Sequence, residues 1–440
     1  PRITYSLTTT FDKAAYIPKY QTRFGPGADD VYGFGAYDKG ENQQYGPEFD
    51  GSEVEIGAPY LDADGNVQQK TGKYSFKDGA RENYYETGIG IQNDISFSSG
   101  GDNGNFFLSY QNLHRTGTVA GDVMDRNTIR FNASRKYKSF TASVNVSYSN
   151  MQGDMNNSGS NGLYNLWNTP GHIYLPDYKD WENVEGGNPN QWINNYYENP
   201  YWQIDTYRRE FRNDRFTGSA TLEWAPLKWL RFMGRAGINT NTRNSSSYTN
   251  AWHFDEYSKT SGRSYATSDI YSDFSTSADF TQRLNADVMA FAEHQFGKNF
   301  GIKGMIGWSM NTRYSEDKNV EAGQLALDNL FNVQHKVGEL QGSNEIIQTR
   351  SQAVYASIDF NFLGWIYLQV TGRNDWTSLL DQSNWSFFYP GANMSLMLSD
   401  AIPALKNSSW LSYLKLRGTF AKVGAVNVSP YRLYNTAEVA

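Results

Sequence analysis

The stretch FTASVNVSYSN, residues 140–150, alternates without interruption between apolar and small polar side chains. Successive side chains of a β-strand point to opposite faces, so this stretch would give a sheet one apolar row and one polar row. The apolar row is Phe140, Ala142, Val144, Val146 and Tyr148, and the polar row is Thr141, Ser143, Asn145, Ser147 and Ser149. A soluble sandwich would bury the apolar row against a second sheet, whereas a membrane barrel would turn it to lipid and enclose the polar row.

The same alternation recurs along the chain in pairs of runs that are joined by short turns. These runs are NTIRFNAS (127–134) with the opening stretch, TGSATLEW (217–224) with WLRFMGRAGINT (229–240), LNADVMAFAEH (284–294) with IKGMIGWSMN (302–311), and QAVYASIDF (352–360) with IYLQVTGRND (366–375). Each pair predicts a β-hairpin. The apolar run from Ala353 to Val370 is about long enough for a membrane helix, but it alternates on both sides of NFLGW and therefore predicts two strands.

Between the hairpins the connections are long, near residues 25–84, 116–125, 151–215, 243–275 and 315–348. Outer-membrane barrels alternate tight periplasmic turns with long outside loops, whereas a soluble sandwich has no reason to place all its long loops at one end. We therefore predict a transmembrane antiparallel up-and-down β-barrel domain over residues 1–440, with about thirteen strands. No heptad is sustained, and the only helix expected is a single turn near Ala401–Lys406.

Composition fits this fold and excludes several functions. The 440 residues are 15% aromatic and include 40 glycines, and Tyr, Gly, Asn and Ser in strand-and-turn order indicate an all-β protein. The net charge is -7 and the basic residues are scattered singly, so nucleic acid is not an expected partner. The absence of cysteine excludes disulfides and thiolate sites. No catalytic motif accompanies the five histidines, so we expect neither an enzyme nor a cofactor.

Several stretches resemble SusC/RagA-like TonB-dependent outer-membrane transporters. They are YIPKYQTRFGPG (16–27), QYGPEFDG (44–51), GIGIQNDISFSSGG (88–101), LSYQNLHRTGTVAGDVMDR (108–126), VTGRNDWTSLL (370–380), FFYPGANMSLMLSD (387–400) and LSYLKLRGTFAKVGAVNVSPYRLY (411–434). Their order and spacing agree with the family over essentially the whole chain. The chain departs from the family's Phe-Pro-Ser at Tyr389-Pro390-Gly391 and from its Gly-Asn at Gly424-Ala425.

The resemblance implies a barrel of roughly 22 strands, of which this chain would be an interior portion without the plug and the last strands. It also implies a Gram-negative outer-membrane location, energy from the TonB complex, and a surface lipoprotein of the SusD/RagB type as partner. Without further strands, the sheet would be open and curved, with two exposed edges.

Polar side chains at inward positions of the predicted strands would make the lumen hydrophilic. The candidates are Arg130, Asn145, Arg235, Asn285, Asp287, Gln369, Arg373 and Asp375. Tryptophans near predicted strand ends match the aromatic girdle of a membrane interface; the alternative is that they are core residues beside turns. These are Trp224, Trp229, Trp365, Trp385 and Trp410.

The connection from 151 to 215 is rich in aromatic residues interleaved with Asn, Asp and Gln. The candidate cargo contacts are Trp167, Trp181, Trp192, Tyr196, Tyr197 and Trp202. Such rings can stack on sugars while amides and carboxylates bind hydroxyls, but they also suit a peptide or a partner protein. Alternatively, they pack the loop into a rigid lid.

DADGN at residues 62–66 shares its spacing with the start of a calcium loop, through Asp62, Asp64 and Asn66. Position twelve of such a loop would be Lys73 instead of the expected Glu, so a β-turn is the preferred interpretation.

Three functions remain open from the sequence. The first is import of an oligosaccharide, or of a peptide as the second choice, through a TonB-dependent barrel. A passive porin or structural barrel is the second, and a soluble carbohydrate-binding sandwich is the third. The hypotheses differ in the solvent that meets the apolar rows.

Overall fold

The computed structural model describes residues 1–27, 35–406 and 410–433. Within them, thirteen strands form one antiparallel sheet in which neighbours in space are also neighbours in sequence, except where β1 pairs with β6. The strands are β1 (Arg2–Asp12), β6 (Gly88–Gly101), β7 (Gly104–Thr116), β8 (Val123–Tyr137), β9 (Phe140–Asn156), β10 (Tyr207–Leu227), β11 (Leu230–Thr249), β12 (Asp273–Phe296), β13 (Phe300–Ala322), β14 (Gln341–Phe362), β15 (Ile366–Thr377), β16 (Ser386–Met397) and β17 (Lys415–Ala421). The predicted all-β, up-and-down fold is confirmed.

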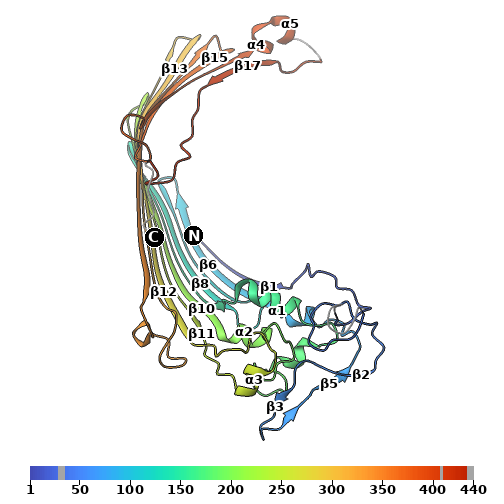
Figure 1. Ribbon diagram of the computed structural model, residues 1–440. Helices are drawn as coiled ribbons and strands as arrows, with labels where there is room; N and C mark the ends of the chain where they lie inside the picture. Colours follow the sequence, from blue (N-terminus) through green and yellow to red (C-terminus); the bar gives the residue numbers. More distant parts are fainter. Residues whose placement is uncertain (28–34, 407–409, 434–440) are drawn as a thin grey trace.

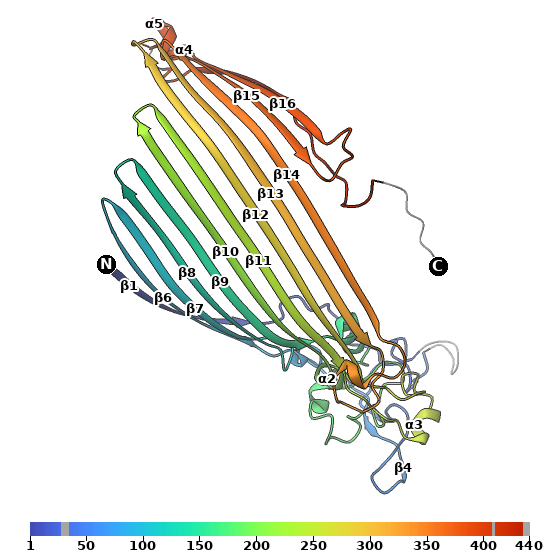
Figure 2. The ribbon, with the colours of Figure 1, turned by 90° about the vertical axis from the view of Figure 1, so that its left-hand side faces the viewer.

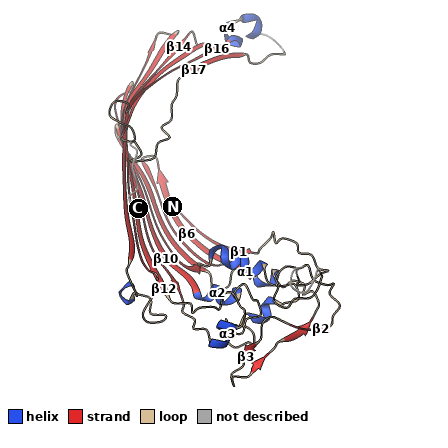
Figure 3. Cartoon of the chain, in the orientation of Figure 1, coloured by secondary structure: helices blue, strands red, loops and turns tan. Residues whose placement is uncertain are grey.

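The sheet is curved and open, with short turns at one end and long connections at the other (Figures 1 and 2). Figure 3 shows that the helices gather mainly at the end with the long connections. Among the described residues, β1 and β17 each pair with a single neighbouring strand. The predicted turn NFLGW joins β14 to β15, with Leu363 and Gly364 both at positive φ, as a tight hairpin turn requires.

Strand register separates apolar and polar side chains onto opposite faces. In β9, Tyr148 lies opposite Ile129 of β8 and Phe216 of β10, whereas Asn145 lies opposite Asn132 and Ser219. The same division continues across the sheet, so the apolar rows share one face.

The apolar face is not covered by a second sheet within the described part of the chain. Leu222, Val288 and Ile306 on this face are 53%, 58% and 57% exposed. Contiguous exposed apolar surface of this extent is not stable against water, and this rules out the sandwich interpretation. The face requires an apolar solvent.

The strands are longer than the sequence pattern predicts. At about 3.3 Å per residue, the 24 residues of β12 extend for roughly 80 Å, whereas the apolar band of an outer-membrane barrel is about 25 Å tall. On β10 the apolar row ends at Phe216, yet the strand continues toward the long connections with Asp214, Arg212 and Glu210 on the same face. The predicted loop boundaries at 151, 215, 243, 275, 315 and 348 therefore fall inside strands and mark the end of the alternation instead.

The long connections form a separate structure, which we call the loop layer. It comprises residues 13–27, 35–87, 157–206 and 250–272, and Figure 1 shows it on the concave side of the sheet. Its elements are β2 (Glu53–Glu55), β3 (Tyr60–Leu61), β4 (Val67–Gln68), β5 (Thr71–Lys73), η1 (Glu82–Tyr84), α1 (Gly159–Trp167), η2 (Leu175–Tyr178), α2 (Pro200–Thr206) and α3 (Glu256–Thr260). η3 (Val333–His335) lies in the connection before β14.

The expectation of one helical turn is too low. Helix α4 (Leu398–Ala401) and helix α5 (Pro403–Lys406) lie where that turn was predicted, but α1, α2 and α3 were missed. These helices are shorter than the span that periodicity can detect. A local sign did exist for α2, because Asn199 caps it by accepting a bond from the Tyr201 amide and Pro200 begins it. Among the described residues no helix is long and apolar enough to cross a membrane.

The positive φ of Gly364 gives a direct test of the β14–β15 turn. Gly364→Val should destabilise the protein by about 1 to 2 kcal/mol, since a β-branched side chain at a φ of +75° strains the backbone although nothing lies within 4 Å of its position. Gly304→Val is the matched control, because the space around Gly304 is equally open and its φ is ordinary. Thermal unfolding in detergent of the full-length protein would compare them, and equal effects would contradict the assigned turn geometry.

Candidate functional site

The eight predicted lumen residues all lie on the polar face of the sheet. Register places Arg235 opposite Asp287, Asn285 opposite Gly237, and Arg130 opposite Ser147. Gln369, Arg373 and Asp375 follow one another at alternate positions of β15. That this face lines a lumen stays a prediction.

Several of these side chains are tied to neighbours on the same face. The Arg235 guanidinium donates to Asp287 Oδ2 at 2.9 and 3.1 Å, and Arg373 Nε donates to Asp375 Oδ1 at 2.8 Å. Asn145 Nδ2 lies 3.4 Å from Ser219 Oγ. These contacts keep the face hydrophilic while fixing the side chains across adjacent strands.

A hydrogen-bonded amide ladder runs across β14, β15 and β16. Asn393 donates to Gln369 Oε1 at 2.9 Å, and Gln369 donates to Asp359 Oδ1 at 2.7 Å. The ladder lines a concavity of about 890 Å³ near the short turns, together with Glu293, Lys303 and Arg417. Asp359 and Asn393 were missed from the sequence, although the alternation around Gln369 places both on its face.

The loop layer covers the polar face at the end with the long connections. Trp202 of α2 packs edge-on against Tyr207, with ring centroids 5.6 Å apart, and Tyr207 begins β10 in the same register as the polar row. The loop layer lies on the concave side in Figure 1, so the polar face is the concave one. The convex face is therefore apolar.

Three of the six predicted cargo contacts are in the hydrophobic core of the loop layer. Trp192 and Trp202 are 0% exposed, and Trp181 is 9% exposed. The Trp192 indole donates to the Tyr197 carbonyl at 2.8 Å, and the Trp181 indole donates to Asp205 at 2.8 Å. Their buried rings present no free surface to a ligand, so for these three the alternative of a packed, rigid lid applies.

The other three candidates lie closer to the surface. Tyr196 is 50% exposed, while Trp167 and Tyr197 are half-buried. Trp167 stacks on Tyr20 with centroids 5.6 Å apart and planes 3° apart, and the Arg81 guanidinium covers Tyr20 at 3.6 Å. Cargo contact by these three residues stays a prediction.

Two further residues that the sequence did not single out connect the parts of the loop layer. Arg263 is almost fully buried and donates to the carbonyls of Trp192, Ala58 and Pro59 at 3.1 to 3.2 Å. Asn199 caps α2 and also donates to the Gly187 carbonyl at 2.8 Å. Both residues satisfy backbone carbonyls that would otherwise be buried without partners.

The DADGN segment forms the hairpin turn between β3 and β4. Asp62 accepts bonds from the amides of Asp64 and Asn66 and from Gln68 Nε2, at 2.7 to 2.9 Å. Gly65 has a φ of +80°, as a turn glycine does. These bonds and the positive φ of Gly65 are those of a hairpin turn.

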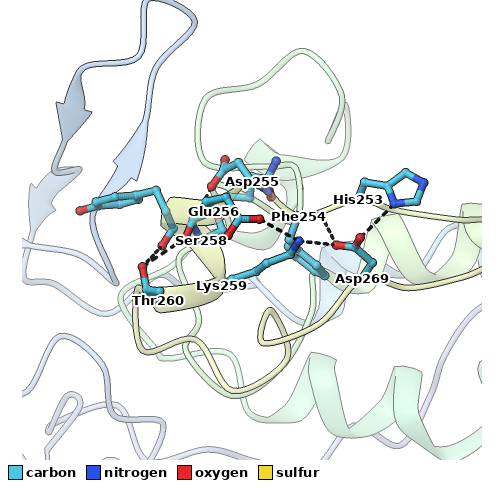
Figure 4. A network of polar contacts seen from close by, with 10 residues as sticks. His253, Phe254, Asp255, Glu256, Ser258, Lys259, Thr260 and Asp269 are labelled. Atoms are coloured by element: carbon cyan, nitrogen blue, oxygen red, sulfur yellow. Dashed lines mark hydrogen bonds and ion pairs between the residues drawn. The ribbon is translucent and has the colours of Figure 1, made fainter.

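A polar network within the connection 250–272 includes His253, Lys259 and Asp269 (Figure 4), and a contact with Asp328 joins it to the connection before β14. His253 Nε2 lies 2.7 Å from Asp328, and Nδ1 lies 3.2 Å from Asp269, which in turn pairs with Lys259 at 3.1 Å. Hydrogen bonds to Asp328 and then to Asp269 raise the pKa of His253. Protonated His253 can therefore donate to two carboxylates at once.

At the short-turn end of the convex face, aromatic rings stack across strands. Trp224 lies between Phe140 and Phe232, with centroids 5.9 and 5.5 Å apart. Trp229 and Trp365 lie in the turns of this end, whereas Trp385 precedes β16 at the opposite end. Trp410 lies in the connection from β16 to β17, near the short-turn end. A girdle at a membrane interface remains the prediction for these residues.

This geometry defines a class: a wall segment of an up-and-down barrel with an apolar outside and a polar inside. No protein-family model and no curated protein matched the chain. Among solved structures, it is similar to the RagAB peptide importer in the closed-closed state, with a TM-score of 0.64 and 14% identity over 81% of this chain and 39% of that chain. The open-open state of the same importer gives a TM-score of 0.63 over 79% and 38%, again at 14% identity.

These TM-scores show that the chain shares the fold of the matched part of the importer structures. The resemblance to SusC/RagA-like barrels is confirmed at that level, and the chain spans less than half the length of the importer chains it matches.

The burial of Trp192 predicts a structural effect on substitution. Trp192→Ala should destabilise the loop layer by about 3 to 5 kcal/mol, because a fully buried indole leaves a cavity. Tyr164→Ala is the control, since Tyr164 is an exposed aromatic residue of α1 in the same layer. Limited proteolysis should cut residues 157–206 faster in the Trp192 variant only. Unchanged cleavage would show that this ring does not hold the layer together.

The His253 network predicts a pH-dependent clamp. Because the folded-state pKa of His253 is raised, its protonated form stabilises the folded protein. This stabilisation is complete below the pKa of His253 in the unfolded chain and is lost as pH rises through the folded-state pKa. Hydrogen exchange of residues 250–272 and 323–340 should therefore accelerate as pH rises through that pKa, after correction for intrinsic exchange. His253→Gln should remove this dependence, and a wild-type rate that does not change with pH would refute the clamp.

Proposed function

We propose that this chain forms part of the wall of an outer-membrane transporter that imports a hydrophilic nutrient in a Gram-negative bacterium. The observation that carries the proposal is the division of the sheet, over the band where the side chains alternate, into a predominantly apolar, exposed convex face and a predominantly polar concave face. Hydrocarbon solvates the first face, and the second provides a wet path for a polar cargo.

Energy for import would come from the TonB complex, and a SusD/RagB-like lipoprotein would close the outer end. Support for this partner is the likeness to a barrel whose solved structure is titled a RagAB peptide importer. The packed loop layer gives such a partner a preformed surface, since its own hydrophobic core fixes its shape.

For the cargo we propose an oligosaccharide, with Trp167, Tyr196 and Tyr197 as the remaining aromatic contacts. Burial of Trp181, Trp192 and Trp202 reduces the ring surface that could stack on sugars. A peptide is the second candidate, favoured by the peptide importer among the similar structures. A passive porin is the alternative that lacks an energy requirement.

Uptake in cells separates these functions. Fluorescent oligosaccharides and short peptides should be offered to the wild-type bacterium and to a strain lacking the full-length gene, with and without a protonophore. We expect a subset of the oligosaccharides to accumulate only in the wild type and only without the protonophore. Uptake that resists the protonophore would identify a porin, and uptake of peptides alone would replace the oligosaccharide as cargo.

A further inference from the structure

A group of arginines without ionic partners lies on the concave face. Residues that lie directly opposite one another on neighbouring strands form rows across the sheet. Three successive rows of this kind cross it from β7 to β14, at the margin of the apolar band nearest the loop layer. They are Ser109–Arg130–Ser147–Thr217–Asn239–Arg283–Arg313–Thr349, Gln111–Thr128–Ser149–Arg215–Asn241–Thr281–Ser315–Ile347, and Phe107–Asn132–Asn145–Ser219–Gly237–Asn285–Asn311–Ser351. We call these rows the arginine belt. From β7 to β14 they contain four arginines and no carboxylate; the next residue of the second row, Asp94 on β6, accepts hydrogen bonds from Gln111 and Gln92.

Arginines elsewhere on this face fall into two groups: some have an acidic partner, and others, such as Arg243 and Arg417, have none within the described ranges. Arg235, Arg373 and Arg231 each bind an acidic side chain at 2.8 to 3.2 Å. By contrast, none of the four belt arginines forms an ion pair with any residue in the described ranges, and all four are exposed. This occurs in a chain whose net charge is -7, so acidic residues are not scarce.

Arg283 and Arg313 are the centre of the belt. They lie directly opposite each other on β12 and β13, where Cβ atoms are about 5 Å apart and like charges destabilise the sheet. Toward the loop layer, the first acids on the same strands and face are Asp279 and Asp317, which lie four residues away, about 13 Å along the strand. Asp287, on the other side of Arg283, is bound by Arg235.

Unpaired guanidinium forks match the geometry of carboxylate, sulfate and phosphate groups, which they bind with two parallel hydrogen bonds. Asn285 and Asn311, opposite each other in the adjoining row, add amide donors beside the arginine pair. A concave wall with low-dielectric backing also strengthens the potential of its charges. An anion on a passing molecule would supply the negative charge that this region of the protein lacks.

We propose that the arginine belt binds anionic groups of the cargo, so that the transported nutrient carries carboxylates, or chemically similar sulfates or phosphates. The inference rests on the proposed import function, which it narrows to an acidic substrate class. Arg283 and Arg313 form the primary contact, and Arg130 and Arg215 extend it along the wall for a cargo with several charges.

Calorimetry on the purified full-length protein in detergent tests the belt without requiring transport. The probes are trigalacturonate with its methyl ester, and hexaglutamate with hexaglutamine, so that the sugar and peptide sources are separate arms. We expect the charged member of one pair to bind at least about tenfold more tightly than its neutral counterpart, and the difference to shrink as salt is raised.

The variant Arg283→Gln/Arg313→Gln should remove this difference, whereas Arg283→Lys/Arg313→Lys should retain part of it. Arg135→Gln is the matched control, because Arg135 is an exposed arginine of β8 that shares the register of the apolar face. Equal binding of charged and neutral probes in both arms would overturn the proposal, as would an equal loss in the Arg135 variant.

A third outcome would give the belt arginines a structural role instead of a binding role. If the Gln variant lowered the unfolding temperature of the unliganded protein and left probe affinity unchanged, the arginines would pair with acids inside the whole protein, and the proposal would be wrong. The uptake experiment remains independent, since import of a neutral cargo alone would overturn the belt's role and leave the transporter intact.

Discussion

The structure depends on the solvent that meets the convex face. Along β10 and β12, alternate residues over about nine positions are mostly apolar and are exposed or partly exposed, and no second layer covers them in the described part of the chain. Only hydrocarbon makes such a face favourable, and hydrocarbon also requires that every backbone polar group be paired within the sheet. The unbroken antiparallel ladder and the tight turns at one end follow from this requirement.

A second consequence is that the sheet has almost no hydrophobic core of its own. The large side chains that are fully buried belong mostly to the loop layer, including Trp192, Trp202 and Leu175. The two parts are thus stabilised by different means: lipid contact and cross-strand bonding for the sheet, and conventional packing in water for the loops. Contacts such as that of Trp202 with Tyr207 join them at the ends of the strands.

Alternation made the strands and their faces predictable, including the face on which the eight lumen candidates lie, because a period of two specifies both the element and the orientation of each residue. It could not locate the strand ends, since beyond Phe216 and Tyr148 both faces meet water and the pattern has no reason to continue. The buried tryptophans were unpredictable for a different reason. An aromatic residue in a polar loop looks the same whether it packs against Tyr178, as Trp192 does, or faces a ligand.

For the proposed import function, burial of these rings limits what the loop aromatics could contribute to selectivity. With Trp181, Trp192 and Trp202 occupied in holding the loops together, stacking can contribute only through the few rings nearer the surface. The concave wall, by contrast, offers guanidinium and amide donors on backbone positions that strand register fixes. Such donors recognise charge and hydrogen-bonding geometry. In the proposed importer, selection along the wall would therefore depend on the chemistry of the cargo's polar groups.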